Sequence, residues 1–399
     1  MAAKRTVDPE GAATAGYSRG ACSHAVDSSD TLWVSGITAA EPDPSGAGWA
    51  CKGDMGRQTA AAYEKLLRIM GAAGYGLSDL VKVIYYMTPE ALPSFNQSIG
   101  VRAELMGVEG LPAVTAIAVE ALLDDGALVE MEAVAERGGK ERPHYPDPRN
   151  DWRLPYKPAW GGGRVLWFAG VVARSYDEMG TPSFPDGIVA QTRAIYVRAR
   201  RILESAGMGF EDVVKTVDYI VPEALEGYGG TEEVRREVFG EHLPASTNIV
   251  IDQLLAPGAL AEIDMFAVAG GTRKVIGAGR QGRGGATFHP AVQKGGLLFL
   301  SGQTGVDGTG ALVGGGVAAQ ARQAFANVGE LVGEAGGGPG NVVRTIEYLA
   351  PQAASEHQEV QKARRELYGD DLPATTTVVV TRLLQPGALV QVQAFADLA

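Results

Sequence analysis

The sequence predicts an α+β protein made of three tandem copies of one unit, which associate within the single chain as a pseudo-trimer around a central sheet barrel. Two observations support this prediction. The same order of strand, helix and turn signals occurs three times along the 399 residues, and segments rich in proline, glycine and charge separate the copies. A chain of this length also exceeds the roughly 100–200 residues that one domain usually holds.

Each copy is predicted to open with a strand and a helix. The strand is a short apolar run that ends in a small residue and glycine. Apolar residues three and four positions apart indicate the helix, which ends at a glycine because glycine enters the left-handed conformation cheaply. The strands are Leu32–Gly36, Leu166–Gly170 and Leu298–Gly302; the helices begin near Gln58, Gln191 and Gln320 and end at Gly74, Gly207 and Gly336.

The second half of each copy repeats as closely. A strand ends at a proline, which has no N–H to donate to a sheet, and a second helix leads to a Leu-Pro-Ala corner. A β-branched run, a Gly-Ala-Leu turn and a closing strand follow. The strands end at Pro89, Pro222 and Pro351, the corners begin at Leu111, Leu243 and Leu372, and the turns begin at Gly126, Gly258 and Gly387. The corners are 132 and 129 residues apart, and chance does not keep so many landmarks in order three times.

These landmarks predict units over residues 18–137, 161–270 and 286–399, joined by linkers over residues 138–160 and 271–285. A sheet whose helices cover one face leaves its other face apolar, and three such sheets can bury those faces together. Fusion in one chain makes the association intramolecular. We therefore expect the functional clefts at the junctions between units, and these clefts need not be alike.

Composition limits the classes of partner. The formal net charge of −12 argues against nucleic acid, since binding to a phosphate backbone depends on clustered lysine and arginine. No apolar run is long enough to span a membrane, and the two cysteines and five histidines show no metal-ligand spacing. We expect a cytoplasmic protein that binds a small molecule, needs no cofactor or metal and acts as a monomeric pseudo-trimer, with further pairing of monomers left open.

Several motifs resemble those of the Rid family, also called the YjgF family of enamine/imine deaminases. The most specific are Ser301–Asp307, Val213–Val217, Glu130–Ala135 and the three Leu-Pro-Ala corners. The resemblance extends over essentially the whole chain in three passes. It implies a chorismate-mutase-like α+β fold for each unit, and an assembly like the family's trimers, which have a cleft at each junction.

The resemblance also indicates where the chemistry should be. The family places a carboxylate-binding arginine directly after the Pro-Ala corner, where a guanidinium offers two planar donors. Those positions hold Val114, Ser246 and Thr375 here, so the usual anion anchor is missing. The family's closing-strand glutamate matches Glu130 and Glu262, whereas the third copy has Gln391.

Glu262 and Glu130 are the candidate catalytic residues, because a carboxylate in a partly dry cleft can act as an acid or base near neutral pH. The alternative is that strand alternation simply exposes both glutamates to solvent. We expect Val114 and Ala116 to make the surroundings of Glu130 apolar, which favours Glu262.

The polar residues of the second copy suggest one cleft around Glu262. Ser246 and Asn248 share a strand face, and Arg174, four residues after Gly170, can supply a positive charge. Tyr156 matches a family tyrosine that reaches into a neighbouring cleft, although packing is the more common role for such an aromatic residue. Together with Thr375 in the third copy, these are the candidate substrate-binding residues.

Three functions remain open at this point. The first is an atypical Rid-type enzyme that acts on an imine or enamine by hydrolysis, tautomerisation or cyclisation. The second is a cyclic-amide hydrolase of the cyanuric acid hydrolase and barbiturase type, which uses paired serine and lysine residues. For this the sequence offers Ser246 with Lys82 and Lys215, but both lysines and their counterpart Arg344 are expected to face solvent. The third is a small-molecule-binding homologue without catalysis.

Overall fold

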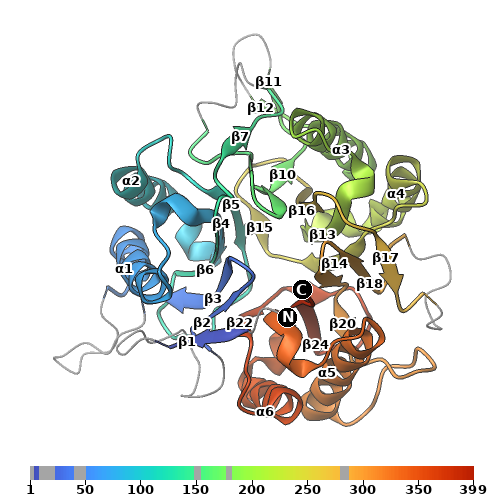
Figure 1. Cartoon of the computed structure of the whole chain (residues 1–399). Coiled ribbons are helices and arrows are strands. Elements are labelled where there is room, and N and C mark those ends of the chain that lie inside the picture. The colour runs from blue at the N-terminus through green and yellow to red at the C-terminus, as the bar shows by residue number, and fades with distance from the viewer. Residues whose placement is uncertain (1–3, 9–22, 40–50, 148–153, 177–181, 279–286) are drawn as a thin grey trace.

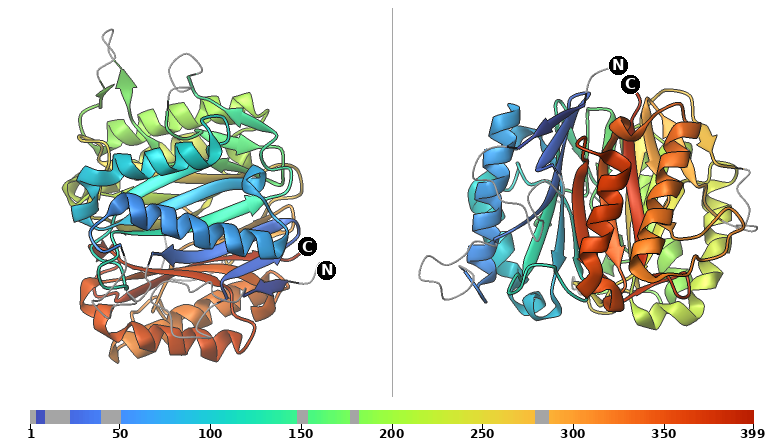
Figure 2. Two further views of the ribbon diagram at one scale, coloured as in Figure 1. Left: turned by 90° about the vertical axis from the view of Figure 1, so that its left-hand side faces the viewer. Right: turned by 90° about the horizontal axis from the view of Figure 1, so that it is seen from below.

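The computed structural model describes residues 4–8, 23–39, 51–147, 154–176, 182–278 and 287–399. Three units surround a common centre, with their sheets facing inward and their helices on the outside (Figure 1). The side views in Figure 2 show the same two layers in each unit. Among the helices of these residues, none has the length and apolar character needed to cross a membrane.

The first sheet contains both parallel and antiparallel pairs. β4 and β5 run parallel because a helix crosses between them, whereas β6 is antiparallel to both β3 and β4. Its strands lie in the order β1 (Arg5–Val7), β2 (Ala25–Ser28), β3 (Thr31–Thr38), β6 (Val129–Glu136), β4 (Leu80–Met87), β5 (Ala113–Ala118) and β15 (Gln253–Leu254).

The other two sheets repeat this plan. The second has the order β23 (Arg382–Leu383), β14 (Ala245–Val250), β13 (Val213–Ile220), β16 (Ala261–Val268), β9 (Val165–Phe168), β8 (Ala159–Gly161) and β7 (Arg142–His144), with β10 (Val171–Val172) also on β16. The third has the order β17 (Lys274–Ile276), β18 (Ala291–Lys294), β19 (Leu297–Leu300), β24 (Val390–Asp397), β21 (Val342–Leu349) and β22 (Ala374–Val379), with β20 (Gln303–Thr304) also on β24. A separate hairpin joins β11 (Ser175–Tyr176) and β12 (Pro182–Ser183).

Two helices cover the outer face of each sheet. They are α1 (Met55–Ala73) and α2 (Phe95–Met106), α3 (Ile188–Ser205) and α4 (Thr231–Phe239), and α5 (Gly316–Glu334) and α6 (His357–Tyr368). Gly74 caps α1 in the left-handed conformation at φ 77°, as the sequence predicts. The repeated glutamine holds each first helix to the turn before the closing strand. In α1, Gln58 donates to the Gly126 carbonyl oxygen at 3.0 Å and accepts from the Leu128 N–H at 2.8 Å, and the other two units repeat both bonds.

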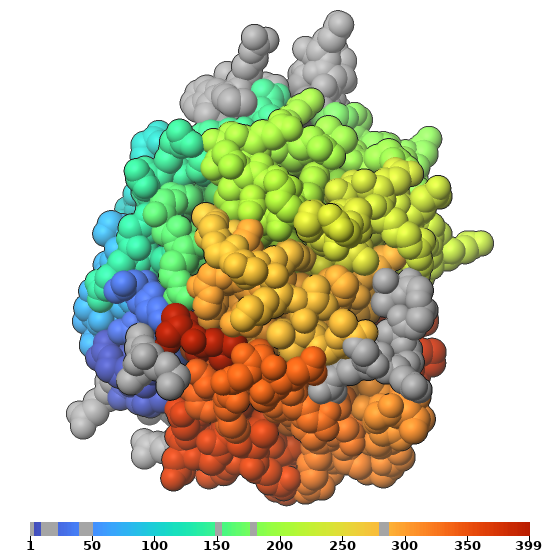
Figure 3. Space-filling view, turned by 45° about the vertical axis from the view of Figure 1, so that its right-hand side comes forward, coloured from blue at the N-terminus to red at the C-terminus, as the bar shows by residue number. Residues whose placement is uncertain are grey.

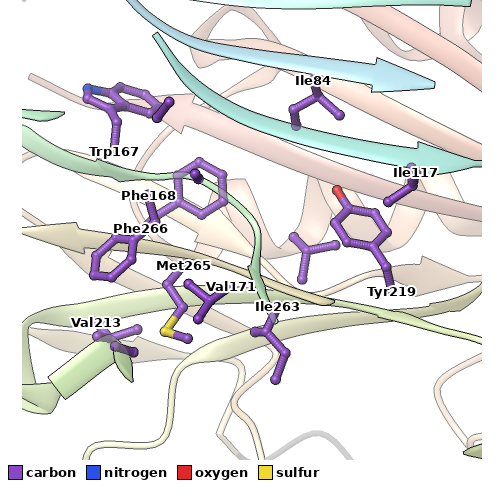
Figure 4. Close-up of a cluster of buried hydrophobic side chains, with 14 of the residues drawn as sticks. Ile84, Ile117, Trp167, Phe168, Val171, Val213, Tyr219, Ile263, Met265 and Phe266 are labelled. Carbon is purple, nitrogen blue, oxygen red and sulfur yellow. The ribbon is translucent and has the colours of Figure 1, made fainter. Parts of the chain in front are cut away.

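The inner faces of the three sheets share one apolar interior. Its centre is a cluster of aromatic rings from all three units, with Trp33 5.7 Å from Trp167 and 5.5 Å from Phe395, and Phe266 6.0 Å from Phe299 between ring centroids. Such pairs contribute about 0.5–1.5 kcal/mol each beyond their buried area. Figure 4 shows Ile117 of β5 beside Tyr219 of β13, so the first two units meet directly. The predicted association of three tandem units around a shared core is confirmed.

Short exchanged strands join the sheets edge to edge. β15 of the second unit pairs with β5 of the first, and β23 of the third pairs with β14 of the second. Two isolated bridges, Ala121 with Val379 and Ser23 with Ala374, join the first unit to the third. Because each link is only one or two residues long, the described residues form three separate packed sheets and not one closed barrel. In the space-filling view the surfaces of the second and third units meet without a gap (Figure 3).

Both segments that the sequence suggests as linkers contain strands. Residues 142–144 form β7 at the edge of the second sheet, and residues 274–276 form β17 at the edge of the third. β1 occupies the corresponding edge of the first sheet. Each unit thus begins with a three-residue strand whose proline- or charge-rich sequence gives no alternating apolar pattern.

Candidate functional site

The seams between units share one backbone arrangement. At the first seam, between units one and two, the Gly170 N–H donates to the Val114 carbonyl oxygen at 3.2 Å. At the second seam, between units two and three, the Gly302 N–H donates to the Ser246 carbonyl oxygen at 3.2 Å. The residue after a Leu-Pro-Ala corner therefore lies against the strand-ending glycine of the next unit. At the third seam, between units three and one, Thr375 takes the same place, since its N–H donates to Ser35 Oγ at 2.7 Å.

Each strand-ending glycine leaves room for the functional residue of the closing strand. A Cβ at these positions would overlap the side chain of that residue, which explains why the repeated motif ends in glycine. The pairs are Gly170 with Glu262, Gly302 with Gln391 and Gly36 with Glu130. The first seam thus combines Val114 with Glu262, the second Ser246 with Gln391, and the third Thr375 with Glu130.

The structure separates residues that the sequence suggested would share one cleft. Glu262 lies at the first seam, whereas Ser246 and Asn248 lie at the second. The reason is that β13 lies between β14 and β16, so a unit presents its corner strand to one neighbour and its closing strand to the other. For the same reason Val114 and Ala116 face Glu262, and the expectation that they surround Glu130 is wrong.

A cavity of about 470 Å³ opens at the first seam. Its walls are mainly apolar and come from α2 and β5 of the first unit and from the segment after β9 of the second. Apolar clefts with a few convergent polar groups are typical ligand sites. The polar and aromatic residues lining it are Phe95, Asn96, Arg102, Tyr156, Arg174 and Glu262. Three of the residues predicted from sequence therefore share one cavity: Glu262, Arg174 and Tyr156.

Glu262 is the buried acid of this cavity, with 8% of its surface exposed. Burial raises the pKa of its carboxyl group to about 8, and the nearby charge of Asp264 adds to the effect. Lys82, Arg174 and a hydrogen bond from the Ala116 N–H act in the opposite direction on this pKa. The carboxyl group is consequently protonated at neutral pH and can give or take a proton within the physiological range.

Glu130 at the third seam is more deeply buried. Burial and the charge of Asp124 raise its pKa well above the ordinary value for glutamate, and its Oε1 has no hydrogen-bond partner among the described residues. Thr375 lies nearby, but its hydroxyl is hydrogen-bonded to Thr345 at 2.9 Å. The predicted binding residue at this seam is thus engaged within its own unit.

The polar residues at the second seam are also engaged with one another. Ser246 accepts a hydrogen bond from Thr216 at 3.1 Å and donates to Asn248 at 3.0 Å. Opposite them lies Gln391, which cannot act as a general acid or base. The second seam therefore has an amide where the first and third seams have the carboxyl group of Glu262 or Glu130.

A buried cation lies beneath each seam. Lys82, Lys215 and Arg344 occupy equivalent strand positions, and the expectation that they face solvent is wrong, because each is covered by the neighbouring unit. Lys82 forms an ion pair with Asp264 across the first seam at 2.8 Å. Arg344 forms an ion pair with Glu132 across the third seam.

Lys215 at the second seam has no such ion pair among the residues that the structure describes. Its Nζ donates to Thr247 Oγ1 at 2.5 Å and to the Leu300 carbonyl oxygen at 2.7 Å, while Gln393 stands where the other units have Glu132 or Asp264. Burial lowers the pKa of Lys215 well below that of free lysine, and the charge of Asp218 offsets this only in part.

The lowered pKa of Lys215 predicts a pH-dependent stability. Between this pKa and the ordinary value of 10.5, the unfolded chain binds more protons at this residue than the folded chain. The free energy of unfolding therefore rises with pH in that range. Lys215→Met is expected to reduce the rise, as measured by urea denaturation at pH 7, 8.5 and 10, whereas Lys274→Met at an exposed position leaves it unchanged. An identical rise in wild type and Lys215→Met would contradict this account.

Arg102, which lines the first-seam cavity, is not among the residues selected from the sequence. In the sequence it stands out only as one of three matching landmarks on the second helices. The sequence did contain a signal for Arg102. Two of the three units have an acid, Asp218 or Glu347, at a strand position where the first unit has Tyr85. An arginine that keeps its place while its carboxylate partner is lost is a candidate for binding another anion.

Comparison with known proteins gives the same threefold division. The model of the family described as Endoribonuclease L-PSP matches residues 12–137, 150–269 and 284–398. A RutC family protein of Pyrococcus horikoshii is 34% identical over 116 residues, which are 29% of this chain and 86% of the relative. The 2-iminobutanoate/2-iminopropanoate deaminase of Mus musculus is 34% identical over 125 residues, which are 31% of this chain and 90% of the relative.

Solved structures also resemble this chain. A Mycobacterium tuberculosis member of the YjgF/YER057c/UK114 family is 31% identical and matches 32% of this chain and 99% of its own, with a TM-score of 0.28. A chorismatase matches 80% of this chain and 93% of its own at 16% identity, with a TM-score of 0.51. The likeness to the chorismatase concerns the fold alone, and it extends over more than one unit.

Proposed function

Because the chain belongs to the Rid (YjgF) family, through three tandem matches to the Endoribonuclease L-PSP model, we propose that it hydrolyses the C=N bond of a small imine or its enamine tautomer in the first-seam cavity. The observation that carries this proposal is Glu262, a buried carboxyl group with a pKa of about 8 that lines the cavity. The deaminases among the relatives are named for this type of substrate.

The proposed reaction uses Glu262 in every proton transfer. Its protonated carboxyl group donates a proton to the imine nitrogen, which makes the imine carbon more electrophilic. The resulting carboxylate then accepts a proton from the water that attacks this carbon, and a carbinolamine forms. Collapse of the carbinolamine moves the hydroxyl proton to nitrogen through the same carboxyl group, and ammonia leaves. One imine and one water thus give one carbonyl compound and one ammonia, with Glu262 protonated again.

Arg174 and the apolar walls support this role. Arg174 favours the charged form of Glu262, which stabilises the carboxylate once the proton has left. Val114 and Ala116 exclude water from the side of the first unit, so the proton stays on the carboxyl group until a substrate enters. The reaction needs no cofactor, since every proton movement is between Glu262, water and substrate.

The test is hydrolysis of 2-iminobutanoate generated in situ, followed by ammonia release against the uncatalysed rate. We expect acceleration by the wild-type protein that is constant below pH 8 and falls about tenfold for each pH unit above it, because the reaction begins from protonated Glu262. No acceleration at any pH, or a rate that rises through pH 8, would overturn the proposed function.

A further inference from the structure

The second helix of each unit carries one buried arginine at the same position. Arg102 on α2, Arg235 on α4 and Arg364 on α6 are 1%, 3% and 0% exposed. Two of them are neutralised within their own unit: Arg235 pairs with Asp218, and Arg364 pairs with Glu347 at 2.9 Å. A buried guanidinium requires such a partner, since the loss of hydration is otherwise uncompensated.

Arg102 lacks this partner because Tyr85 replaces the carboxylate. The guanidinium lies 5.0 Å from the centre of the Tyr85 ring and 5.5 Å from that of Phe95. The Tyr85 hydroxyl is hydrogen-bonded to Tyr63 at 2.5 Å. Within the described part of the chain, no carboxylate forms an ion pair with Arg102, and its Nε and Nη1 have no hydrogen-bond partner. Contacts with two aromatic faces offset only part of the cost of a buried cation.

The first-seam cavity is where a ligand can supply the carboxylate that Arg102 lacks. Arg102 lines this cavity from α2, together with Val114, the residue that stands where the family has its arginine. Glu262 and Arg174 line it from the second unit. A ligand in the cavity would meet a fixed cation, a carboxyl group that is protonated at neutral pH, and apolar walls.

We propose that Arg102 is the anion-binding residue of the first-seam cavity, and that the ligand is a small carboxylate with an apolar body. A guanidinium stays charged and forms charge-assisted hydrogen bonds with a carboxylate, and two of the nitrogens of Arg102, Nε and Nη1, have no hydrogen-bond partner among the described residues. The positive charge that binds the ligand thus comes from helix α2 of the first unit, whereas the family's arginine lies on the strand after the Pro-Ala corner. The inference rests on the proposed function only for what happens to the ligand after it binds. Binding of the carboxylate to Arg102 can be measured without any reaction.

The test is isothermal titration of the full chain with 2-oxobutanoate, a stable carboxylate, and with 2-butanone, which has a similar apolar body and no charge. Wild type is expected to bind 2-oxobutanoate, and Arg102→Gln to weaken this binding about tenfold or more, the loss expected for charged hydrogen bonds. 2-Butanone is expected to bind wild type and Arg102→Gln equally weakly. Inorganic phosphate is the second anion, and preferential binding of phosphate would overturn the assignment of a carboxylate.

Two matched variants make the result specific. Tyr85→Glu restores the internal carboxylate that the third unit has, so it should weaken 2-oxobutanoate binding as Arg102→Gln does while the guanidinium remains. Arg364→Gln removes the equivalent arginine from the third unit and should leave binding unchanged in the folded protein. Equal affinities for 2-oxobutanoate in wild type, Arg102→Gln and Tyr85→Glu would overturn the inference.

Failure of this inference is distinguishable from failure of the proposed function. Binding that depends on Arg102 without any imine hydrolysis would retain the anion site and reject the reaction. Imine hydrolysis whose KM is the same in wild type and Arg102→Gln would retain the reaction and reject the anion site.

Discussion

Glu262→Gln is expected to lower kcat/KM for hydrolysis of 2-iminobutanoate by about 10²–10⁴-fold, the usual contribution of a positioned general acid–base group. Glutamine keeps the size of the side chain beside Gly170 but can neither donate an acidic proton nor accept one from water. The natural Gln391 shows that this strand position accommodates the amide. The measurement is the initial rate of ammonia release at pH 7, and the fall in rate above pH 8 should also disappear from any residual activity.

Glu130→Gln is the matched control. It makes the same chemical change at the third seam and should leave most of the activity, because the proposed reaction takes place at the first seam. If Glu130→Gln abolished turnover and Glu262→Gln did not, the active cleft would be that of Glu130 and Thr375. Equal losses would mean that both glutamates support catalysis.

Glu132→Gln is expected to destabilise the protein by about 3–5 kcal/mol, because it leaves Arg344 buried without its counter-charge. The side chains of both residues are almost fully buried, and Glu132 also accepts a hydrogen bond from Thr376 at 2.6 Å. Since the pair crosses the third seam, its loss weakens the closure between the third and first units. Urea denaturation measures the change as a shift of the midpoint at constant slope.

Two comparisons sharpen this result. Glu366→Gln removes a carboxylate from an exposed pair with Arg322 and should change the midpoint little. The double variant Glu132→Leu with Arg344→Met replaces the buried pair by apolar side chains. It should recover most of the stability lost in Glu132→Gln, because that loss comes from burying an unpaired charge. A midpoint for Glu132→Gln within error of wild type would show that the pair contributes no net stability.

Much of the fold was predictable from repetition in the sequence. Glycine, proline and the helix-starting glutamine recur at the same places because each has a local structural role. Gly74 ends a helix at positive φ, and Gln58 bonds the turn that begins at Gly126. Such roles depend on residues near in sequence or on one contact within a unit. Three copies of the same signals therefore identified three units and their shared apolar interior.

The candidate site was only partly predictable. Glu262, Arg174 and Tyr156 were selected from the sequence and share one cavity. Ser246 and Asn248 were assigned to the same cleft because they belong to the same copy, but a cleft between units draws on two copies. Which strand edge of a unit meets which neighbour depends on strand order in the sheet, and the linear sequence does not contain that order explicitly.

The sequence by itself determined the three units, the loss of the family's arginine after each Pro-Ala corner, and the retention of glutamate in two closing strands. Only the tertiary structure decided which of these residues face one another. It also decided that Lys82 and Arg344 are paired across seams while Lys215, within the described part of the chain, is not, and that Arg102 is a buried cation beside the cavity of Glu262. The physical reason is that charge and acidity in a seam depend on what the neighbouring unit buries against each side chain, and burial is a property of the assembled chain.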